Sequence, residues 1–140
     1  MKILYEAPAT VIGGRSGSAA SADGTLRVRL AQPEVLGGPG GEGTNPEQLF
    51  ATGFAACFLS AIRKAAGERG VELASDSNVT ATVGLGERDD GTGLGLRVAL
   101  SIDLPGVDED EATAIVAAAE QFCAYSHATR GNVGLSIDIA

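Results

Sequence analysis

The chain has 140 residues and a mass of 14.1 kDa, a size that predicts one domain, spanning residues 1–140, with a sizeable hydrophobic core. Its formal net charge of -8 and sequence pI near 4.5 argue against nucleic acid and anionic membrane as partners. Two cysteines are too few for the disulfide framework of a secreted domain, and with one histidine they are too few for a convincing zinc site.

The first third of the chain is predicted to be rich in β-structure. Residues 2–12 mix apolar and β-prone side chains, which predicts a strand, and they lack the sustained apolar run of a secretory signal. We therefore expect a cytoplasmic protein. A glycine-rich turn at 13–17 leads to a second short strand at 18–22. Asp23-Gly24 is a hairpin signal, and the alternation of apolar and basic residues over 26–30 predicts a third strand.

The stretch Thr44–Gly67 is predicted to form a central helix. Asn45 suits the N-cap, Pro46 suits the first helical position, and Gln48 falls where the partner in a capping box lies. The apolar run Leu49–Ile62 leaves almost no polar side. Its 14 residues are too few to span a bilayer and are typical of a buried core helix.

The second half of the chain predicts a hairpin, a second helix and a last strand. After a glycine at 67 or 70 ends the central helix, the expected elements are a strand at 79–83, a polar turn at 87–93, its hairpin partner at 94–104, a helix capped by Asp108 that ends near Cys123, and a strand at 133–139. The order β-β-β-α-β-β-α-β, with short turns between paired strands, predicts an α+β fold with an antiparallel sheet and a buried central helix.

Four side chains could carry chemistry, and each has an ordinary alternative role. Cys57 lies mid-helix, where a lone thiol is more often a small buried hydrophobe than a nucleophile. To react it needs a nearby cation that favours the thiolate, and Arg15 in the first turn is either that cation or a solvated turn residue. Glu47 could merely oppose the helix dipole. Cys123 could be only a helix-end residue.

Three motifs of the chain can be compared with known families. The first is Thr44–Phe50 followed by Ala55–Phe58, around the first cysteine. The second is Phe122–Asn132, around the second cysteine, and the third is the arginine turn at 13–17. Together they resemble the Ohr branch of the OsmC/Ohr family, the organic hydroperoxide resistance proteins, with Ala124 where the family usually has proline. The resemblance covers essentially the whole chain.

This resemblance implies a thiol-dependent peroxidase that acts on organic hydroperoxides. By motif, Cys57 is the peroxidatic nucleophile, Cys123 the resolving thiol, Arg15 the activating cation and Glu47 the carboxylate that positions it. The resemblance also implies an intertwined homodimer with its sites near the subunit interface. It implies no metal, haem or other cofactor, and a dihydrolipoyl group as the dithiol reductant.

The spacing of two of these residues makes a demand on the assembly. Glu47 and Cys57 are ten residues apart, which is roughly 15 Å along a straight helix. Arg15 could not easily touch both. Either the helix bends, near Thr52-Gly53, or a second chain supplies part of the site, and we hypothesise a site completed by dimerisation.

Aromatic residues around the two thiols suggest an apolar substrate pocket. The candidates are Phe50, Phe54 and Phe58 near Cys57, with Phe122 and Tyr125 beside Cys123. Such a lining would favour alkyl or lipid hydroperoxides over hydrogen peroxide. Phenylalanines at helical spacing are, however, more often plain core residues.

Other functions stay open from the sequence alone. A disulfide-exchange enzyme would be expected to carry a Cys-x-x-Cys pair, which this chain lacks. A non-catalytic binder of a small apolar ligand would keep its function in Cys57→Ser, whereas a peroxidase would lose it. An OsmC-like relative with altered activity is the nearest alternative, and Ala124 is the one motif-level hint of it.

Overall fold

The structure, a computed structural model, describes all 140 residues. The chain forms two compact units, Met1–Leu49 and Phe50–Ala140. The α+β class is confirmed, with two three-stranded sheets in place of one. The single domain over 1–140 stays a prediction.

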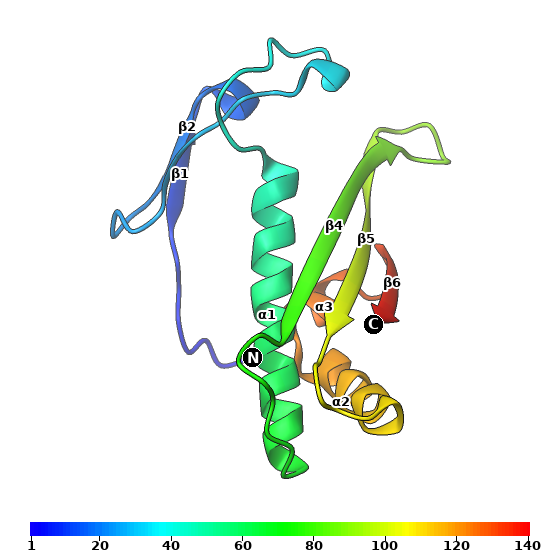
Figure 1. Ribbon diagram of the computed structural model, residues 1–140. Coiled ribbons are helices and arrows are strands. Elements are labelled where there is room, and N and C mark those ends of the chain that lie inside the picture. The colour runs from blue at the N-terminus through cyan, green and yellow to red at the C-terminus, as the bar shows by residue number, and fades with distance from the viewer. The chain divides into compact units, whose positions relative to one another are not determined.

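The first unit is a small antiparallel sheet of strand order β1-β2-β3, drawn in blue in Figure 1. Its elements are β1 (Ala9–Ile12), the 3₁₀ turn η1 (Gly14–Ser16), β2 (Ser18–Ser21), β3 (Arg27–Arg29) and the 3₁₀ turn η2 (Glu34–Leu36). The predicted strand at 2–12 is shorter than expected, because β2 offers only four partners, from Ser18 opposite Ile12 to Ser21 opposite Ala9. This unit buries only two hydrophobic side chains, Ala19 and Leu30.

The central helix α1 (Pro46–Glu68) begins and ends as its sequence predicts. The Asn45 side chain accepts a hydrogen bond from the Gln48 amide at 2.9 Å, which satisfies one of the free N–H groups of the first turn. At the other end Gly70 has a φ of 71°, and Val71 N–H donates to the carbonyl of Ala66 at 2.9 Å. This is a Schellman end, so Gly70 rather than Gly67 terminates the helix.

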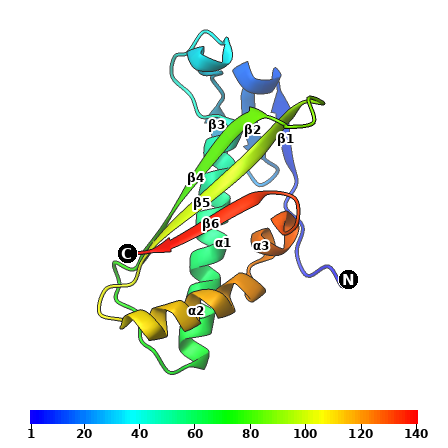
Figure 2. The same cartoon turned by 90° about the vertical axis from the view of Figure 1, so that its right-hand side faces the viewer.

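The second unit packs a sheet of order β4-β5-β6 against helices, and Figure 2 shows its three strands side by side. Its other elements are β4 (Asn78–Glu87), β5 (Leu94–Asp103), α2 (Glu109–Phe122), α3 (Ala124–Thr129) and β6 (Gly134–Ile139). The strands β4 and β5 form the predicted hairpin, but β6 runs parallel to β5, which corrects the expectation of a purely antiparallel sheet. The helices between β5 and β6 return the chain to the end of the sheet where β5 begins, so β6 must run in the same direction.

The core of the second unit lies between α1, β5 and α2. Its fully buried side chains follow the helical and strand periods, and the largest are Phe54, Phe58, Ile62, Val98, Leu100, Ile102 and Ile115. By length and composition α1 is also the one helix that could cross a membrane, but a buried core helix passes the same test. One face of α1 is buried in the core, as a core helix requires, but other apolar side chains such as Leu49 and Leu59 are only partly buried.

Candidate active site

In the first unit Arg15 and Glu47 form a two-pronged ion pair. Arg15 Nη1 donates to Glu47 Oε2 at 2.8 Å, and Arg15 Nη2 donates to Glu47 Oε1 at 2.7 Å. The Arg15 side chain is 33% exposed and the Glu47 side chain 14% exposed. The hydrogen bonds from Arg15 hold the pKa of Glu47 below its usual range, and the same bonds raise the pKa of Arg15.

The backbone around this pair explains why residues 32 positions apart meet. Arg15 lies in η1, at the tip of the β1-β2 hairpin, where a Cβ on Gly17 would stand 1.7 Å from the Ile12 carbonyl oxygen. The start of α1 is tied to β3, because Thr44 N–H donates to the Arg29 carbonyl at 2.9 Å and Ala31 N–H donates to the Thr44 carbonyl at 2.9 Å. Glu47 follows in the first helical turn.

In the second unit the two cysteines lie next to one another as free thiols. Cys123 Sγ donates to Cys57 Sγ over 3.4 Å. Cys57 is partly exposed, whereas Cys123 is 1% exposed. A disulfide requires sulfurs about 2.05 Å apart, so the two atoms need to approach by only about 1.4 Å. The pair therefore has one thiol open to a reagent and one protected partner within reach.

Cys123 owes its position to a break between two helices. It ends α2, with its N–H donating to the Ala119 carbonyl at 2.9 Å, and it caps α3, with Sγ accepting from Ser126 N–H at 3.5 Å. The helix α3 was not predicted, because six residues leave too short a pattern to detect. Ala124 occupies the first position of α3, where either alanine or proline fits.

The surroundings of Cys57 in this unit disfavour its thiolate. Burial is the largest cause and raises the pKa of Cys57, and the neighbouring sulfur of Cys123 adds to the rise, because two adjacent sulfurs do not readily ionise together. The backbone amides of Tyr125 and Ala124 act in the opposite direction and lower the pKa of Cys57, because their N–H dipoles favour the thiolate. To react as a thiolate near neutral pH, Cys57 needs additional positive charge.

The five predicted pocket residues take three kinds of position. Phe50, Phe54 and Tyr125 form an aromatic cluster, with ring centroids 5.7 to 6.0 Å apart. Phe58 is fully buried in the core. Phe122 is 44% exposed, and its ring lies 4.1 Å below the ammonium of Lys64. Their role as a substrate lining stays a prediction.

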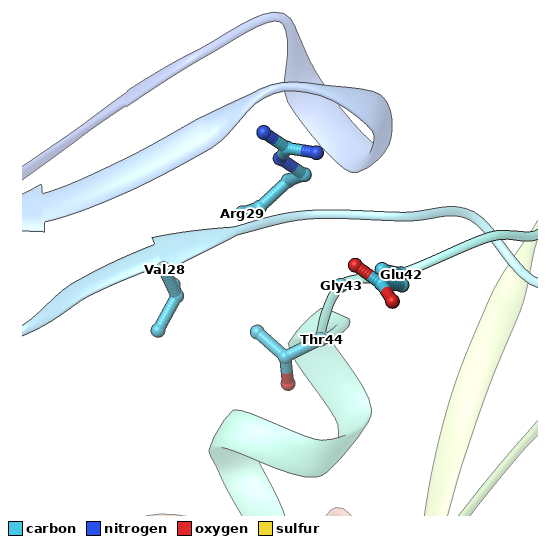
Figure 3. Close-up of a pocket in the computed structure, with 5 residues that line it drawn as sticks. All are labelled: Val28, Arg29, Glu42, Gly43 and Thr44. Carbon is cyan, nitrogen blue, oxygen red and sulfur yellow. The ribbon is translucent and has the colours of Figure 1, made fainter.

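Two hollows of the surface lie elsewhere. The first, of about 370 Å³, is lined by Val28, Arg29, Glu42, Gly43 and Thr44. Figure 3 shows the first two on β3 and the other three on the loop that precedes α1. The second, of about 1040 Å³, follows the β4-β5 hairpin. None of the five predicted pocket residues lines either hollow. No group of three or more His, Cys, Asp or Glu side chains is arranged to hold a metal ion.

Fold, arginine turn and thiol pair together define a class of protein. The family model described as OsmC-like protein matches residues 38–138, and the chain belongs to this family. Within the family it is similar to organic hydroperoxide resistance proteins. A relative of that name from Xanthomonas axonopodis pv. citri is 45% identical over 139 residues, which cover 99% of this chain and 96% of the relative. The organic hydroperoxide resistance protein OhrB of Bacillus subtilis is 39% identical over 97% of this chain and 98% of its own length.

Solved structures give the same result. An organic hydroperoxide resistance protein from Legionella pneumophila superimposes with a TM-score of 0.92 at 45% identity, covering 99% of both chains. The structure of Bacillus subtilis OhrB gives a TM-score of 0.89 at 38% identity, covering 99% of this chain and all of that one. The predicted family membership is therefore confirmed.

Proposed function

We propose that the protein is a cysteine-based peroxidase that reduces organic hydroperoxides, alkyl or lipid, to alcohols as part of the response to oxidative stress. The names of its relatives support a role in organic hydroperoxide resistance. The observation that carries the thiol mechanism is the 3.4 Å separation of Cys57 Sγ and Cys123 Sγ, with only the first thiol open to a reagent.

In the first step the thiolate of Cys57 attacks the terminal oxygen of the hydroperoxide. The S–O bond forms as the O–O bond breaks, the sulfur is oxidised to sulfenic acid, and the departing alkoxide takes up a proton to become the alcohol. Because the local surroundings raise the pKa of Cys57, a cation must favour the thiolate and offset charge on the departing oxygen. We assign this role to Arg15.

Arginine suits this role because its guanidinium stays charged and its planar fork can engage several partners. Glu47 supports the assignment, since it fixes two of the guanidinium nitrogens and leaves the remaining donors for other groups. We further propose that the site is completed in an intertwined homodimer, in which the second copy of the chain supplies part of the site around Cys57. Support for a dimer comes from the first unit, which buries only Ala19 and Leu30 while several large apolar side chains are exposed.

In the second step Cys123 attacks the sulfur of the sulfenic acid. A disulfide forms, water leaves, and Cys57 is protected from irreversible oxidation. An external dithiol such as a dihydrolipoyl group, carried by a lipoylated protein, then reopens the disulfide by exchange and is itself oxidised. The cycle uses no metal and no haem, and it suits the reducing cytoplasm, where dithiols regenerate the enzyme.

The substrate preference is proposed to come from the aromatic side chains. Phe50 and Phe54 lie in the turns of α1 just before Cys57, and Tyr125 lies two residues after Cys123. The three rings form one cluster, which favours an apolar organic group on the substrate. Phe122 extends the proposed lining, and the fully buried Phe58 supports it from the core. An apolar lining contributes little binding energy to hydrogen peroxide, which has no organic group to pack against it.

The test is consumption of cumene hydroperoxide and of hydrogen peroxide with dihydrolipoamide as reductant. We expect faster turnover of cumene hydroperoxide and complete loss in Cys57→Ser. Cys123→Ser, given cumene hydroperoxide without any thiol reductant, should undergo one turnover and stop at the sulfenic acid, which dimedone traps. Full activity in Cys57→Ser would overturn the assignment of Cys57 as the nucleophile. No peroxide consumption by the wild type would favour the non-catalytic binder, and equal turnover of the two peroxides would favour an OsmC-like relative with altered activity.

A further inference from the structure

The helix α1 contains two glycines, Gly53 and Gly67, whose surroundings differ. Glycine is less favourable than alanine inside a helix, so each needs a reason or is replaceable. A Cβ on Gly67 would meet nothing within 4 Å. A Cβ on Gly53 would stand 2.9 Å from Tyr125 Oη and 3.3 Å from both Cε2 and Cζ of the same ring. The missing side chain of Gly53 is therefore a notch that the end of the Tyr125 ring occupies.

Other contacts hold the ring in this seat. Its centroid lies 5.9 Å from that of Phe50 and 5.7 Å from that of Phe54, so the ring touches helix side chains on either side of the notch. The Tyr125 carbonyl accepts a hydrogen bond from Thr129 Oγ1 at 2.8 Å, which fixes the backbone from which the ring extends. The ring is thus positioned from α3 at one end and from α1 at the other.

The seat lies beside the reactive thiol. Gly53 and Cys57 are four residues apart, so they lie on the same face of α1 in successive turns. Tyr125 also follows two residues after Cys123, whose Sγ lies 3.4 Å from Cys57 Sγ. A ring seated in the notch therefore forms a wall next to Cys57 on the side toward the start of the helix.

We propose that Gly53 is a specificity-determining position, whose notch seats Tyr125 so that the ring packs against the apolar organic group of a hydroperoxide bound at Cys57. This inference rests on the proposed function. A side chain at position 53 pushes the ring off the helix by a few tenths of an ångström. The wall then no longer fits a bulky organic group, while a small reagent still reaches the thiol.

The test compares Gly53→Ala with Gly67→Ala, which changes the same residue type in the same helix without meeting a neighbour. We expect Gly53→Ala to raise KM for cumene hydroperoxide about tenfold, with kcat and the rate with hydrogen peroxide little changed. Gly67→Ala should behave as the wild type. Adding Tyr125→Phe to Gly53→Ala removes the atom nearest to the new methyl group and should bring KM part of the way back to the wild-type value. Unchanged KM in Gly53→Ala, or no rescue by Tyr125→Phe, overturns the proposal.

A second measurement separates the notch from the peroxidase activity. In a Cys123→Ser background Cys57 is the single thiol, and its rates of alkylation by iodoacetamide and by N-phenylmaleimide report access for a small and a bulky reagent. We expect Gly53→Ala to slow the bulky reagent selectively. If Gly53→Ala slows the bulky reagent but no variant turns over peroxide, the proposed function is refuted and the role of the notch stands. If Gly53→Ala alkylates at the wild-type rates with both reagents, the role of the notch is refuted. If Gly53→Ala fails to fold, Tyr125→Ala removes the wall without altering α1 and must give the same loss of selectivity.

Discussion

Replacement of Glu47 by glutamine tests whether the ion pair between Arg15 and Glu47 stabilises the folded protein. The substitution keeps the length of the side chain but removes the charge and one of the two acceptor oxygens that Arg15 now binds at 2.7 and 2.8 Å. Charge-assisted bonds are strong, but solvent screens a pair in which Arg15 is 33% exposed. We therefore expect Glu47→Gln to lower the free energy of unfolding by about 1 kcal/mol at pH 7.

The pH dependence of this loss has a definite sign. Because Arg15 depresses the pKa of Glu47 in the folded protein, the pair stabilises fully above the unfolded pKa of about 4.3 and less as the pH falls through the folded value. Urea unfolding of the wild type, Glu47→Gln, Arg15→Gln and the double variant, at pH 7 and at pH 3, yields the coupling energy at each pH. We expect the coupling to shrink at the lower pH.

A matched pair offers the control. Arg69 and Glu111 also form an ion pair, with side chains 42% and 32% exposed. Because water screens this pair more, its coupling energy in the same double-mutant cycle should be smaller than that of Arg15 and Glu47. A coupling between Arg15 and Glu47 that is zero at pH 7, or that is the same at pH 7 and pH 3, would refute the reasoning.

Two further predictions concern the second unit. Ala124→Pro removes a backbone amide that favours the Cys57 thiolate, so the pKa of Cys57 should rise and the midpoint of its alkylation rate against pH should move upward. Ala124→Ser keeps the amide and should leave that midpoint in place; a common midpoint for both variants would contradict the prediction. Phe58→Ala empties a fully buried site and should lower the free energy of unfolding by about 3–5 kcal/mol in urea titrations. Phe122→Ala, at a side chain 44% exposed, should cost about 1 kcal/mol or less, and equal losses for the two would show that the core does not depend on Phe58.

Local features of the sequence determined most of the secondary structure. Asn45 and Pro46 mark the start of α1, and Asp108 caps α2 by accepting from the amides of Asp110 and Glu111, because capping depends on neighbours three residues away. The β4-β5 hairpin was equally predictable from a polar turn between two β-prone stretches. The motifs around Cys57 and Cys123 were sufficient to identify the family.

What the local sequence could not determine are the contacts between distant segments. Periodicity identifies a strand but not its neighbour, so only the packed sheet decided that β6 pairs with β5 in parallel. Cys57 and Cys123 are 66 residues apart, and their sulfurs lie 3.4 Å from one another only because α3 is docked against α1. The seat of Tyr125 on Gly53 arises in the same way. From the sequence alone, a glycine inside a helix is only a residue of low helix propensity. Its role as a seat for Tyr125 is visible only in the folded chain.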